Sequence, residues 1–308
     1  MIIARIRGRL GNQLFQYAMA RSLAWERETE LRLDLTHFLF EGYECRLPAF
    51  KTDLKLASLS DIGCPVLSSH LVRAAGRASA GGATERLDAK VTRSVPRFSK
   101  RTYIRERTKF IGYDERAADF ILTSGGDIYL DGFWQSEKWF EKNRDRILDE
   151  LRLAAEPPKE MMSWMEKMQT EGSVALHVRR GDYAQPGTGE IYGVCDERYY
   201  RAAEKAIWER VGSPHFFVFS DDLAWAKDNL KLDSPFTMVE TLELQDHHEL
   251  LLMSSCQHNI ISNSTFGWWG AYLNRNRSKV VIAPSRWTAP GSGMEENDVL
   301  PDSWVKIP

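Results

Sequence analysis

Three features of the sequence predict an α/β protein made of two domains. The chain has 308 residues, whereas one domain holds roughly 100–200. It begins with a strand–loop–helix pattern, and its second half alternates short apolar runs with amphipathic segments of helical length. This alternation is typical of βα units on a parallel sheet. We therefore expect an N-terminal α/β domain over residues 1–160 and a C-terminal Rossmann-like domain over residues 161–308.

The N-terminal domain begins with a clear local pattern. Residues 2–6 are mostly apolar, Gly8 and Gly11 interrupt the run, and apolar residues then recur at helical spacing from Leu14 to Leu23. This pattern predicts a strand, a loop and a helix. A loop between a strand and a helix suits a phosphate, but this one is neither GxGxxG nor a Walker A loop, so a plain tight turn is the alternative.

Two further segments complete the predicted framework of this domain. Residues 31–35 predict a second strand, and residues 127–140 join another strand to an aromatic-rich turn. A charged helical pattern follows, and Glu156-Pro157-Pro158 is then the best candidate for a linker. We place the domain boundary within residues 150–172.

Charge is balanced over the whole chain but not along it. Lys and Arg number 41 against 43 Asp and Glu, and the net charge of −2 excludes binding of nucleic acid or membrane by bulk charge. Residues 70–109 nevertheless hold eleven basic and three acidic residues. We interpret this stretch as a solvated basic insertion of helix and loop. The alternatives are a nucleic-acid patch and a peripheral contact with acidic lipids, where a membrane-bound substrate would lie.

The cysteines and the first residues predict a cytoplasmic protein. The four cysteines are scattered, without CxxC or metal-type spacing, which predicts reduced structural thiols: Cys45, Cys64, Cys195 and Cys256. The start lacks the apolar core of a signal peptide, and no window approaches the ~20 apolar residues of a membrane-spanning helix.

In the C-terminal domain, each predicted strand runs into a polar sequence. The apolar runs are 174–178, 216–219, 259–262 and 279–283, and the sequences after them are, in order, Arg179-Arg180-Gly181-Asp182-Tyr183, Ser220-Asp221-Asp222, Asn263-Ser264-Thr265 and Pro284-Ser285-Arg286-Trp287. Ligands of open α/β sheets bind beyond the carboxyl ends of the strands. We therefore expect the four polar clusters to meet in one crevice.

The residue types at this crevice indicate a phosphate or pyrophosphate. Arg179 and Arg180 offer planar, permanent charges that bind anions through several hydrogen bonds. Ser264 and Thr265 open a helix, whose first N–H groups and dipole favour negative charge. The structural alternatives are a surface ion pair for the arginines and a plain helix N-cap for Ser264.

The other polar candidates each have a structural alternative. Asp221-Asp222 could hold a metal, accept hydrogen bonds from guanine, or cap the next helix. His177 is either a satisfied core histidine or a ligand contact beside Arg179. The cluster at 246–249 does not predict a metal site, because consecutive helical residues point around the axis. The aromatic turn offers Trp134 as a platform for a sugar ring.

Together these motifs resemble glycosyltransferase family 11, the α-1,2-fucosyltransferases. The matching sequences are GNQLFQYA (11–18), DGFWQSEKWF (131–140), HVRRGDY (177–183), FSDD (219–222), SNSTFGWWGAYL (262–273) and, near the end, VIAPSRW and LPDSWVKI. They run in family order from residue 8 to the C-terminus, so the resemblance covers nearly the whole chain.

The resemblance implies a GT-B-like fold of two Rossmann-type domains facing a cleft. It implies inverting transfer of L-fucose from GDP-β-L-fucose to the 2-hydroxyl of a terminal galactose, without a metal or other cofactor. The acceptor would be an oligosaccharide or lipid-linked glycan of bacterial surface polysaccharide, such as O-antigen. Vertebrate relatives carry an amino-terminal membrane anchor that is absent here, which favours a cytoplasmic enzyme, peripheral at the inner membrane at most.

The resemblance also implies roles for individual residues. Arg179 would hold the β-phosphate, while His177 and Asp222 would lie near guanine. Ser264 and Thr265 would reach the pyrophosphate, and Gly11 and Asn12 would close over phosphate and fucose. Beside these roles, Arg180 and Asn263 are further donor-binding candidates, and Trp134 and Gln135 are acceptor-binding candidates. Two positions depart from the family pattern: Arg9 replaces the second glycine of GGLGNQ, and Gly267 stands where serine is common.

Metal-free transfer requires donors that stabilise charge on the departing pyrophosphate, and this is the role predicted for Arg179. Asp182 is then either the general base or a residue that orients its neighbours. Three other functions compete with this one. A hydrolase would use Asp182, Asp221 and Asp222 as acid and base. An RNA- or nucleotide-binding protein would use the basic stretch, and a related fucosyltransferase would act on another hydroxyl.

Overall fold

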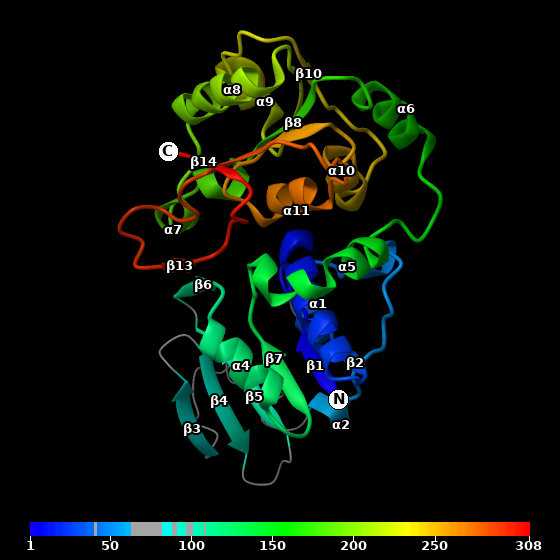
Figure 1. Ribbon diagram of the computed structural model, residues 1–308, viewed down its shortest axis with the longest axis vertical. Coiled ribbons are helices and arrows are strands. Elements are labelled where there is room, and N and C mark those ends of the chain that lie inside the picture. Colours follow the sequence, from blue (N-terminus) through cyan, green and yellow to red (C-terminus); the bar gives the residue numbers. More distant parts are fainter. Residues whose placement is uncertain (40–41, 63–81, 88–90, 97–100, 108) are drawn as a thin grey trace. The chain divides into compact units, whose positions relative to one another are not determined.

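The computed structural model describes residues 1–39, 42–62, 82–87, 91–96, 101–107 and 109–308. They form two compact units (Figure 1), Met1–Arg152 with Asn297–Val299 and Leu153–Glu296 with Leu300–Pro308. The second unit begins at Leu153, within the predicted boundary range of residues 150–172, but residues 153–160, which were assigned to the first domain, belong to the second unit. The difference arises because α6 (Lys159–Met168) packs on α10 (Asp246–Met253) within the second unit.

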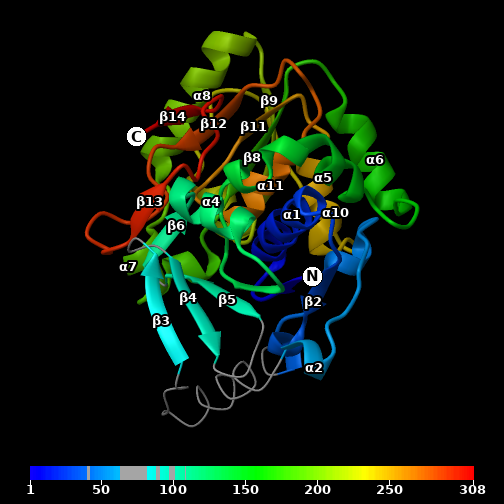
Figure 2. The same ribbon diagram turned by 60° about the horizontal axis from the view of Figure 1, so that its bottom comes forward.

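The first unit is built on a mixed sheet with the strand order β2-β1-β7-β5-β4-β3. These strands are β2 (Leu31–Asp34), β1 (Ile2–Arg5), β7 (Ile128–Asp131), β5 (Thr102–Glu106), β4 (Val91–Pro96) and β3 (Gly82–Leu87). The first four are parallel, which confirms the strands predicted near residues 2–6, 31–35 and 127–131. β4 and β3 continue the sheet in antiparallel order beside β5, as Figure 2 shows.

This hairpin corrects the prediction for the basic stretch. Residues 82–87, 91–96 and 102–106 are strands of the sheet, and not a helix-and-loop insertion. These segments are strands because they pair with one another and with β7, and not because of their own composition. Residues 70–81, 88–90, 97–100 and 108, and with them much of the predicted lipid-facing surface, lie outside the described residues.

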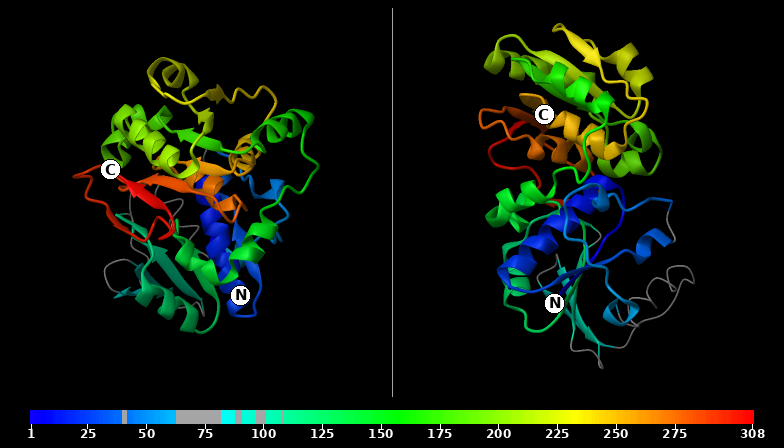
Figure 3. Two further views of the ribbon diagram at one scale, coloured as in Figure 1. Left: turned by 45° about the horizontal axis from the view of Figure 1, so that its top comes forward. Right: turned by 90° about the vertical axis from the view of Figure 1, so that its right-hand side faces the viewer.

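Helices and short turns complete the first unit. They are α1 (Leu10–Glu26), η1 (Thr36–Leu39), η2 (Leu47–Ala49), α2 (Leu59–Ile62), α4 (Glu115–Thr123), η3 (Glu137–Trp139), η4 (Glu141–Asn143) and α5 (Arg144–Glu150). The long helix α1, blue in Figure 3, follows β1 directly, as predicted. The short strand β6 (Phe110–Gly112) pairs with the end of β13 (Glu295–Asn297), and Tyr113 N–H donates to Asn297 O at 2.9 Å.

The second unit has an all-parallel sheet with the strand order β10-β9-β8-β11-β12-β14. These strands are β10 (Phe236–Met238), β9 (His215–Ser220), β8 (Ser173–Val178), β11 (His258–Ile260), β12 (Val281–Pro284) and β14 (Val305–Ile307). The four strands predicted for this half are confirmed. The helices not yet named are η5 (Gly181–Ala184), α7 (Thr188–Tyr192), α8 (Glu197–Val211), α9 (Leu223–Asn229) and α11 (Thr265–Leu273).

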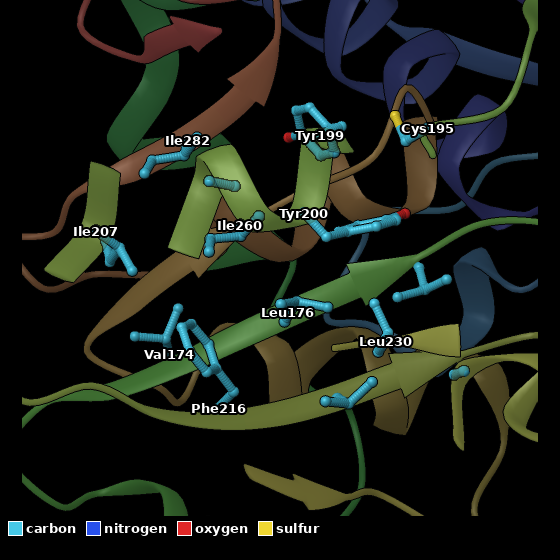
Figure 4. Packing of buried hydrophobic residues seen from close by; sticks show 14 residues of the cluster. Val174, Leu176, Cys195, Tyr199, Tyr200, Ile207, Phe216, Leu230, Ile260 and Ile282 are labelled. Atoms are coloured by element: carbon cyan, nitrogen blue, oxygen red, sulfur yellow. The ribbon is translucent and has the colours of Figure 1, made fainter. Parts of the chain in front are cut away.

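Alternate residues of β8 pack on opposite faces of this sheet. Val174 and Leu176 belong to a core with Tyr199, Tyr200 and other residues of α8, shown in Figure 4. Ala175 belongs to a second core that includes residues of α6 and α10. Helices therefore cover both faces, as a doubly wound α/β sheet requires. Among the residues described, no helix is both long and apolar enough to cross a bilayer.

Candidate functional site

The carboxyl edge of the second sheet gathers the polar sequences expected there. β8 is followed by Arg179, and its neighbour β9 is followed by Asp221. On the other side of β8, β11 leads into Ser264, the N-cap of α11. Beyond β11 in the sheet, β12 leads into Trp287, which is buried and whose carbonyl accepts from Asn263 Nδ2 at 3.2 Å.

Two carboxylates hold the Arg179 guanidinium. Nη1 lies 2.6 Å from Asp221 Oδ2, and Nη2 donates to Asp182 Oδ1. The side chain is 15% exposed, and its Cζ lies 5.3 Å from the centroid of the Tyr183 ring. Arginine is permanently charged and binds anions bidentately. Arg179 is therefore a fixed positive charge at the edge where a ligand would bind.

Asp221 also fixes the backbone that follows Arg179. Its Oδ1 accepts the N–H of Arg180 at 2.8 Å. A Cβ on Gly181 would lie 2.4 Å from Asp221 Oδ2, closer than real contacts allow. The glycine of the RRGD sequence is thus required for the approach of Asp221.

Arg180 and Asp222 are both engaged by α9. The Arg180 Cζ lies 3.9 Å from the centroid of the Trp225 ring, within the range of a cation–π interaction. Asp222 caps the helix by accepting the N–H of Trp225 at 3.0 Å. The helix-cap alternative for Asp222 is therefore confirmed, and its contact with guanine stays a prediction.

His177 is a buried residue of β8, only 5% exposed. Its Nδ1 lies 2.9 Å from the Ser262 hydroxyl, and its ring lies 5.8 Å from the ring of Phe266. Burial, and then the positive charge of Arg179, lower the pKa of His177 to about 3. The imidazole is thus neutral at physiological pH, as in a core histidine, and its predicted contact with the donor stays a prediction.

The opening of α11 supplies donors at the same edge of the sheet. Ser264 caps the helix, its Oγ accepting the N–H of Phe266 at 3.3 Å, and Thr265 is the first helical residue. At the other end, Lys279 Nζ donates to the carbonyls of Ala271 and Asn274, both at 2.7 Å. A cation at the C-terminal end of α11 complements the negative end of the helix dipole. The positive end of the dipole lies at Ser264 and Thr265.

Asn263 uses its side chain to hold neighbouring loops. Its Nδ2 donates to the carbonyls of Tyr192 and Trp287, at 2.7 and 3.2 Å, and its Oδ1 accepts from the Cys195 thiol. The residue is only 4% exposed. This geometry indicates that Asn263 positions the start of α11, and its predicted direct contact with the donor stays untested.

In the first unit, the loop after β1 follows a glycine-dependent course despite Arg9. Gly8 has φ +77°, which favours glycine. Arg9 is extended, with φ −80° and ψ 171°, so any residue fits where the family has its second glycine. Gln13 closes the loop, because its amide donates to Gly8 O and Glu44 O, both at 2.8 Å.

Asn12 and Gln135 come together, whereas Trp134 does not face solvent. Gln135 Nε2 donates to Asn12 Oδ1 at 3.0 Å, which joins the GNQ loop to the turn after β7. Gly11 is buried in the first turn of α1. Trp134 is 1% exposed and packs edge-on against Trp139, with ring centroids 5.2 Å apart. The prediction of Trp134 as a sugar platform is therefore wrong for this structure.

A buried charge cluster near the same turn was not predicted from the sequence. Asp131 ends β7 and pairs with Arg5 at 3.3 Å, Arg7 at 3.6 Å and Arg105 at 3.0 Å. Burial raises the pKa of Asp131, but the three arginine charges outweigh it and hold the pKa below its usual value. The sequence contained a signal for this cluster, because an acidic residue ends each of two neighbouring parallel strands, Asp131 in β7 and Glu106 in β5.

Glu106, at the end of β5, shapes this turn. It is 5% exposed and accepts the N–H groups of Phe133, at 2.6 Å, and Trp134, at 3.3 Å. Burial raises its pKa to about 7. A Cβ on Gly132 would lie 2.6 Å from Glu106 Cβ and equally close to the Trp134 ring, so the turn depends on glycine.

Within the described part of the chain, no three His, Cys, Asp or Glu side chains are grouped so that they could hold a metal ion. The sequence Asp246–Glu249 instead begins α10, where Gln245 and His248 form a capping box. That activity is independent of metal stays a prediction.

Comparison with known proteins identifies the family. The sequence profile of Glycosyl transferase family 11 matches residues 102–308, the whole second unit and part of the first. The chain belongs to glycosyltransferase family 11. This family 11 chain is 30% identical to an α-1,2-colitosyltransferase of Escherichia coli, over 100% of its own length and 99% of that protein's. It is 27% identical to the O-antigen biosynthesis glycosyltransferase WbnK of Escherichia coli, over 97% and 98% of the two chains.

A solved structure of another glycosyltransferase has a similar fold. The fucosyltransferase NodZ from Bradyrhizobium aligns with a TM-score of 0.50 and 14% identity, over 87% of this chain and 91% of that one. The predicted GT-B-like class, with Rossmann-type sheets in both units, is confirmed.

Proposed function

We propose that this family 11 enzyme transfers L-fucose, with inversion, from GDP-β-L-fucose to the 2-hydroxyl of a terminal β-galactoside. The observation that carries the proposal is Arg179, held by two aspartates at the end of β8 and next in the sheet to the strand that leads into α11. The names of the relatives support the α-1,2 linkage and a role in O-antigen synthesis.

The chemistry requires stabilisation of the departing GDP. As the bond between fucose C1 and the β-phosphate oxygen breaks, negative charge grows on the pyrophosphate. Arg179 supplies a fixed cation for that charge, and Ser264 and Thr265 supply hydroxyls and N–H groups at the positive end of α11. These groups do the work that a metal does in other transferases, so we propose metal-independent activity.

The first unit is proposed to contact the sugars. Asn12 and Gln135 are joined by a hydrogen bond at the carboxyl ends of β1 and β7, where a parallel sheet offers ligand-binding edges. Gly11, at the start of α1, lets backbone approach a ligand closely. We assign the galactose-terminated oligosaccharide or lipid-linked glycan to this unit.

The proposed partners place the reaction at the cytoplasmic face of a membrane. Lipid-linked glycans are built there from nucleotide sugars, so we propose a cytoplasmic protein with at most peripheral contact with the inner membrane, through the basic stretch near 70–109. The net charge of −2 gives no support to a nucleic-acid partner.

The test is GDP release from GDP-fucose with a panel of β-galactosides in EDTA, with the product linkage determined by NMR. An α-1,2 product would support donor, linkage and metal independence together. Transfer to a different hydroxyl would favour the related fucosyltransferase instead. The absence of both transfer and GDP binding would refute the proposal.

A second donor has support from one specific observation. The relative that matches over the full chain at 30% identity is named a colitosyltransferase. Colitose is L-fucose without its 3-hydroxyl, so the same α-1,2 chemistry applies to both. Competition between the two GDP-sugars, read as the ratio of kcat/KM values, decides between them: a ratio in favour of GDP-colitose would make fucose the secondary donor.

A further inference from the structure

The guanidinium proposed to bind the donor phosphate is already occupied. Arg179 contacts Asp221 through Nη1 and Asp182 through Nη2. Asp222 follows directly in sequence, so the cluster contains two arginines and three aspartates and has a net charge of −1. A pyrophosphate is itself anionic, and a site of net negative charge repels it.

The two carboxylates differ in how firmly they are held. Asp221 accepts the Arg180 N–H as well as binding Arg179, and it lies against Gly181. Asp182 belongs to the four-residue turn η5, three residues along the chain from Arg179, and its side chain is 43% exposed against 27% for Asp221. Asp182 is therefore the partner that an arriving anion displaces at lower cost.

We propose that the donor pyrophosphate displaces Asp182 from Arg179, and that the released carboxylate takes the proton of the acceptor hydroxyl. This inference rests on the proposed function. The β-phosphate takes the place of the Asp182 carboxylate at Nη2 of Arg179, while Asp221 stays bound to Nη1. Asp182 thus orients Arg179 before the donor binds and becomes a catalytic residue afterwards.

In the transfer step, the acceptor oxygen forms the bond to fucose C1 as its proton passes to the Asp182 carboxylate. The bond between C1 and the β-phosphate oxygen breaks, and its electron pair leaves with GDP against Arg179. Because Asp182 is bound to Arg179 until the donor arrives, the base becomes available only in the donor complex, and donor binding precedes productive acceptor binding.

The deciding variant is Asp182→Asn, which keeps the shape and removes the charge. We expect it to bind GDP about two- to fivefold more tightly than the wild type, because the phosphate no longer displaces a carboxylate, while kcat falls about 10²- to 10³-fold. GDP affinity is measured by calorimetry and kcat by GDP release. Asp182→Glu restores a carboxylate, so it should recover part of kcat and lose the gain in affinity.

Asp149→Asn is the matched control. Asp149 pairs with Arg152 at 2.5 Å across the same spacing of three residues, but belongs to the first unit. Its removal should change neither GDP affinity nor kcat.

Each outcome separates the two proposals. If Asp182→Asn binds GDP no more tightly while the wild type transfers fucose, the displacement is refuted and the proposed function stands. If it binds more tightly but keeps its kcat, Asp182 is not the base. If the wild type neither binds GDP nor transfers fucose, the proposed function itself fails.

Discussion

At the scale of single residues, the site is defined by side chains that other side chains hold in place. An arginine on a surface samples many rotamers, and an exposed ion pair contributes little because solvent screens it. Arg179 is 15% exposed and is held by two carboxylates and an aromatic ring, so its geometry is fixed before a ligand arrives. Such preorganisation is what electrostatic catalysis requires.

Arg179→Ala should abolish turnover and leave the fold intact. Loss of one positioned donor to a developing anion typically costs about 10²- to 10³-fold in rate. GDP release measures the rate, and circular dichroism with thermal unfolding checks the fold. Arg152→Ala removes an arginine that is 58% exposed in the first unit and should leave the rate unchanged. A variant at position 179 with more than about a tenth of wild-type activity would contradict the role.

Glu106 makes the pH dependence of stability testable at one residue. Its folded pKa is raised to about 7, so the folded state holds a proton that the unfolded state loses near pH 4.5. The contribution of Glu106 to the free energy of unfolding is therefore fully present below pH 4.5, where the buried carboxyl is uncharged. It is lost as pH rises through 7, because the carboxylate must then be buried with its charge.

Glu106→Gln removes this titration and keeps an oxygen that accepts from Phe133 and Trp134. We expect the free energy of unfolding of the variant to decline less than that of the wild type between pH 4.5 and 7, by an amount on the order of a few kcal/mol. Urea unfolding at several pH values measures it. Parallel pH curves for the two proteins would show that Glu106 is not protonated in the folded state.

At the scale of elements, the position of α11 against β8 depends on one glycine. A Cβ at Gly267 would lie 2.6 Å from the Nδ1 of His177, the atom that contacts Ser262. The absence of a side chain here sets the distance between the helix that offers N–H donors and the strand that carries Arg179.

Gly267→Ala should therefore displace His177 and weaken GDP binding. Overpacking of this kind costs about 1–3 kcal/mol of stability, and we expect GDP affinity to fall about tenfold. Calorimetry and thermal unfolding measure the two effects. Gly125→Ala is the control, since a Cβ there has nothing within 4 Å and the backbone is not left-handed. Equal behaviour of both variants would mean that α11 tolerates the shift.

The predictability of each element follows from how local its signal is. The strands that carry Arg179, Asp221 and Ser264 are short β-branched and aromatic runs that end in polar residues, and the sequence alone predicts them. β3, β4 and β5 were missed because their pairing partners, and not their own composition, make them strands. The burial of Trp134 could not be predicted, because it depends on φ +55° and on Glu106, distant in sequence.

At the scale of the whole molecule, GDP should stabilise one part of the chain. Arg179, Ser264 and Thr265, which are proposed to bind the departing pyrophosphate of GDP, belong to the second unit. Saturation at about 100 times Kd stabilises a folded state by roughly 2.7 kcal/mol. Hydrogen exchange should show protection near residues 177–183 and 262–266, and Arg179→Ala should not show it. Protection confined to the first unit would relocate the donor site.

The sequence also predicted the division into two units without predicting the path of the chain between them. The linker at Glu156-Pro157-Pro158 lies close to the first crossing, but nothing in the sequence indicated that Asn297–Val299 return to the first unit. That return depends on hydrogen bonds of Asn297 with Tyr113 and of Asp298 with Ser136, pairs far apart in sequence. Long-range pairs of this kind leave no periodic pattern.

The return of Asn297–Val299 restricts how such genes exchange parts. The chain passes between the two units after Arg152, after Glu296 and again after Val299, and β14 then completes the second sheet. A single recombination event near codon 152 therefore transfers the second unit together with residues 297–299, which must pack in the first unit of the other parent. Chimaeras of related transferases should inherit residues 297–299 from the parent that supplies the first unit.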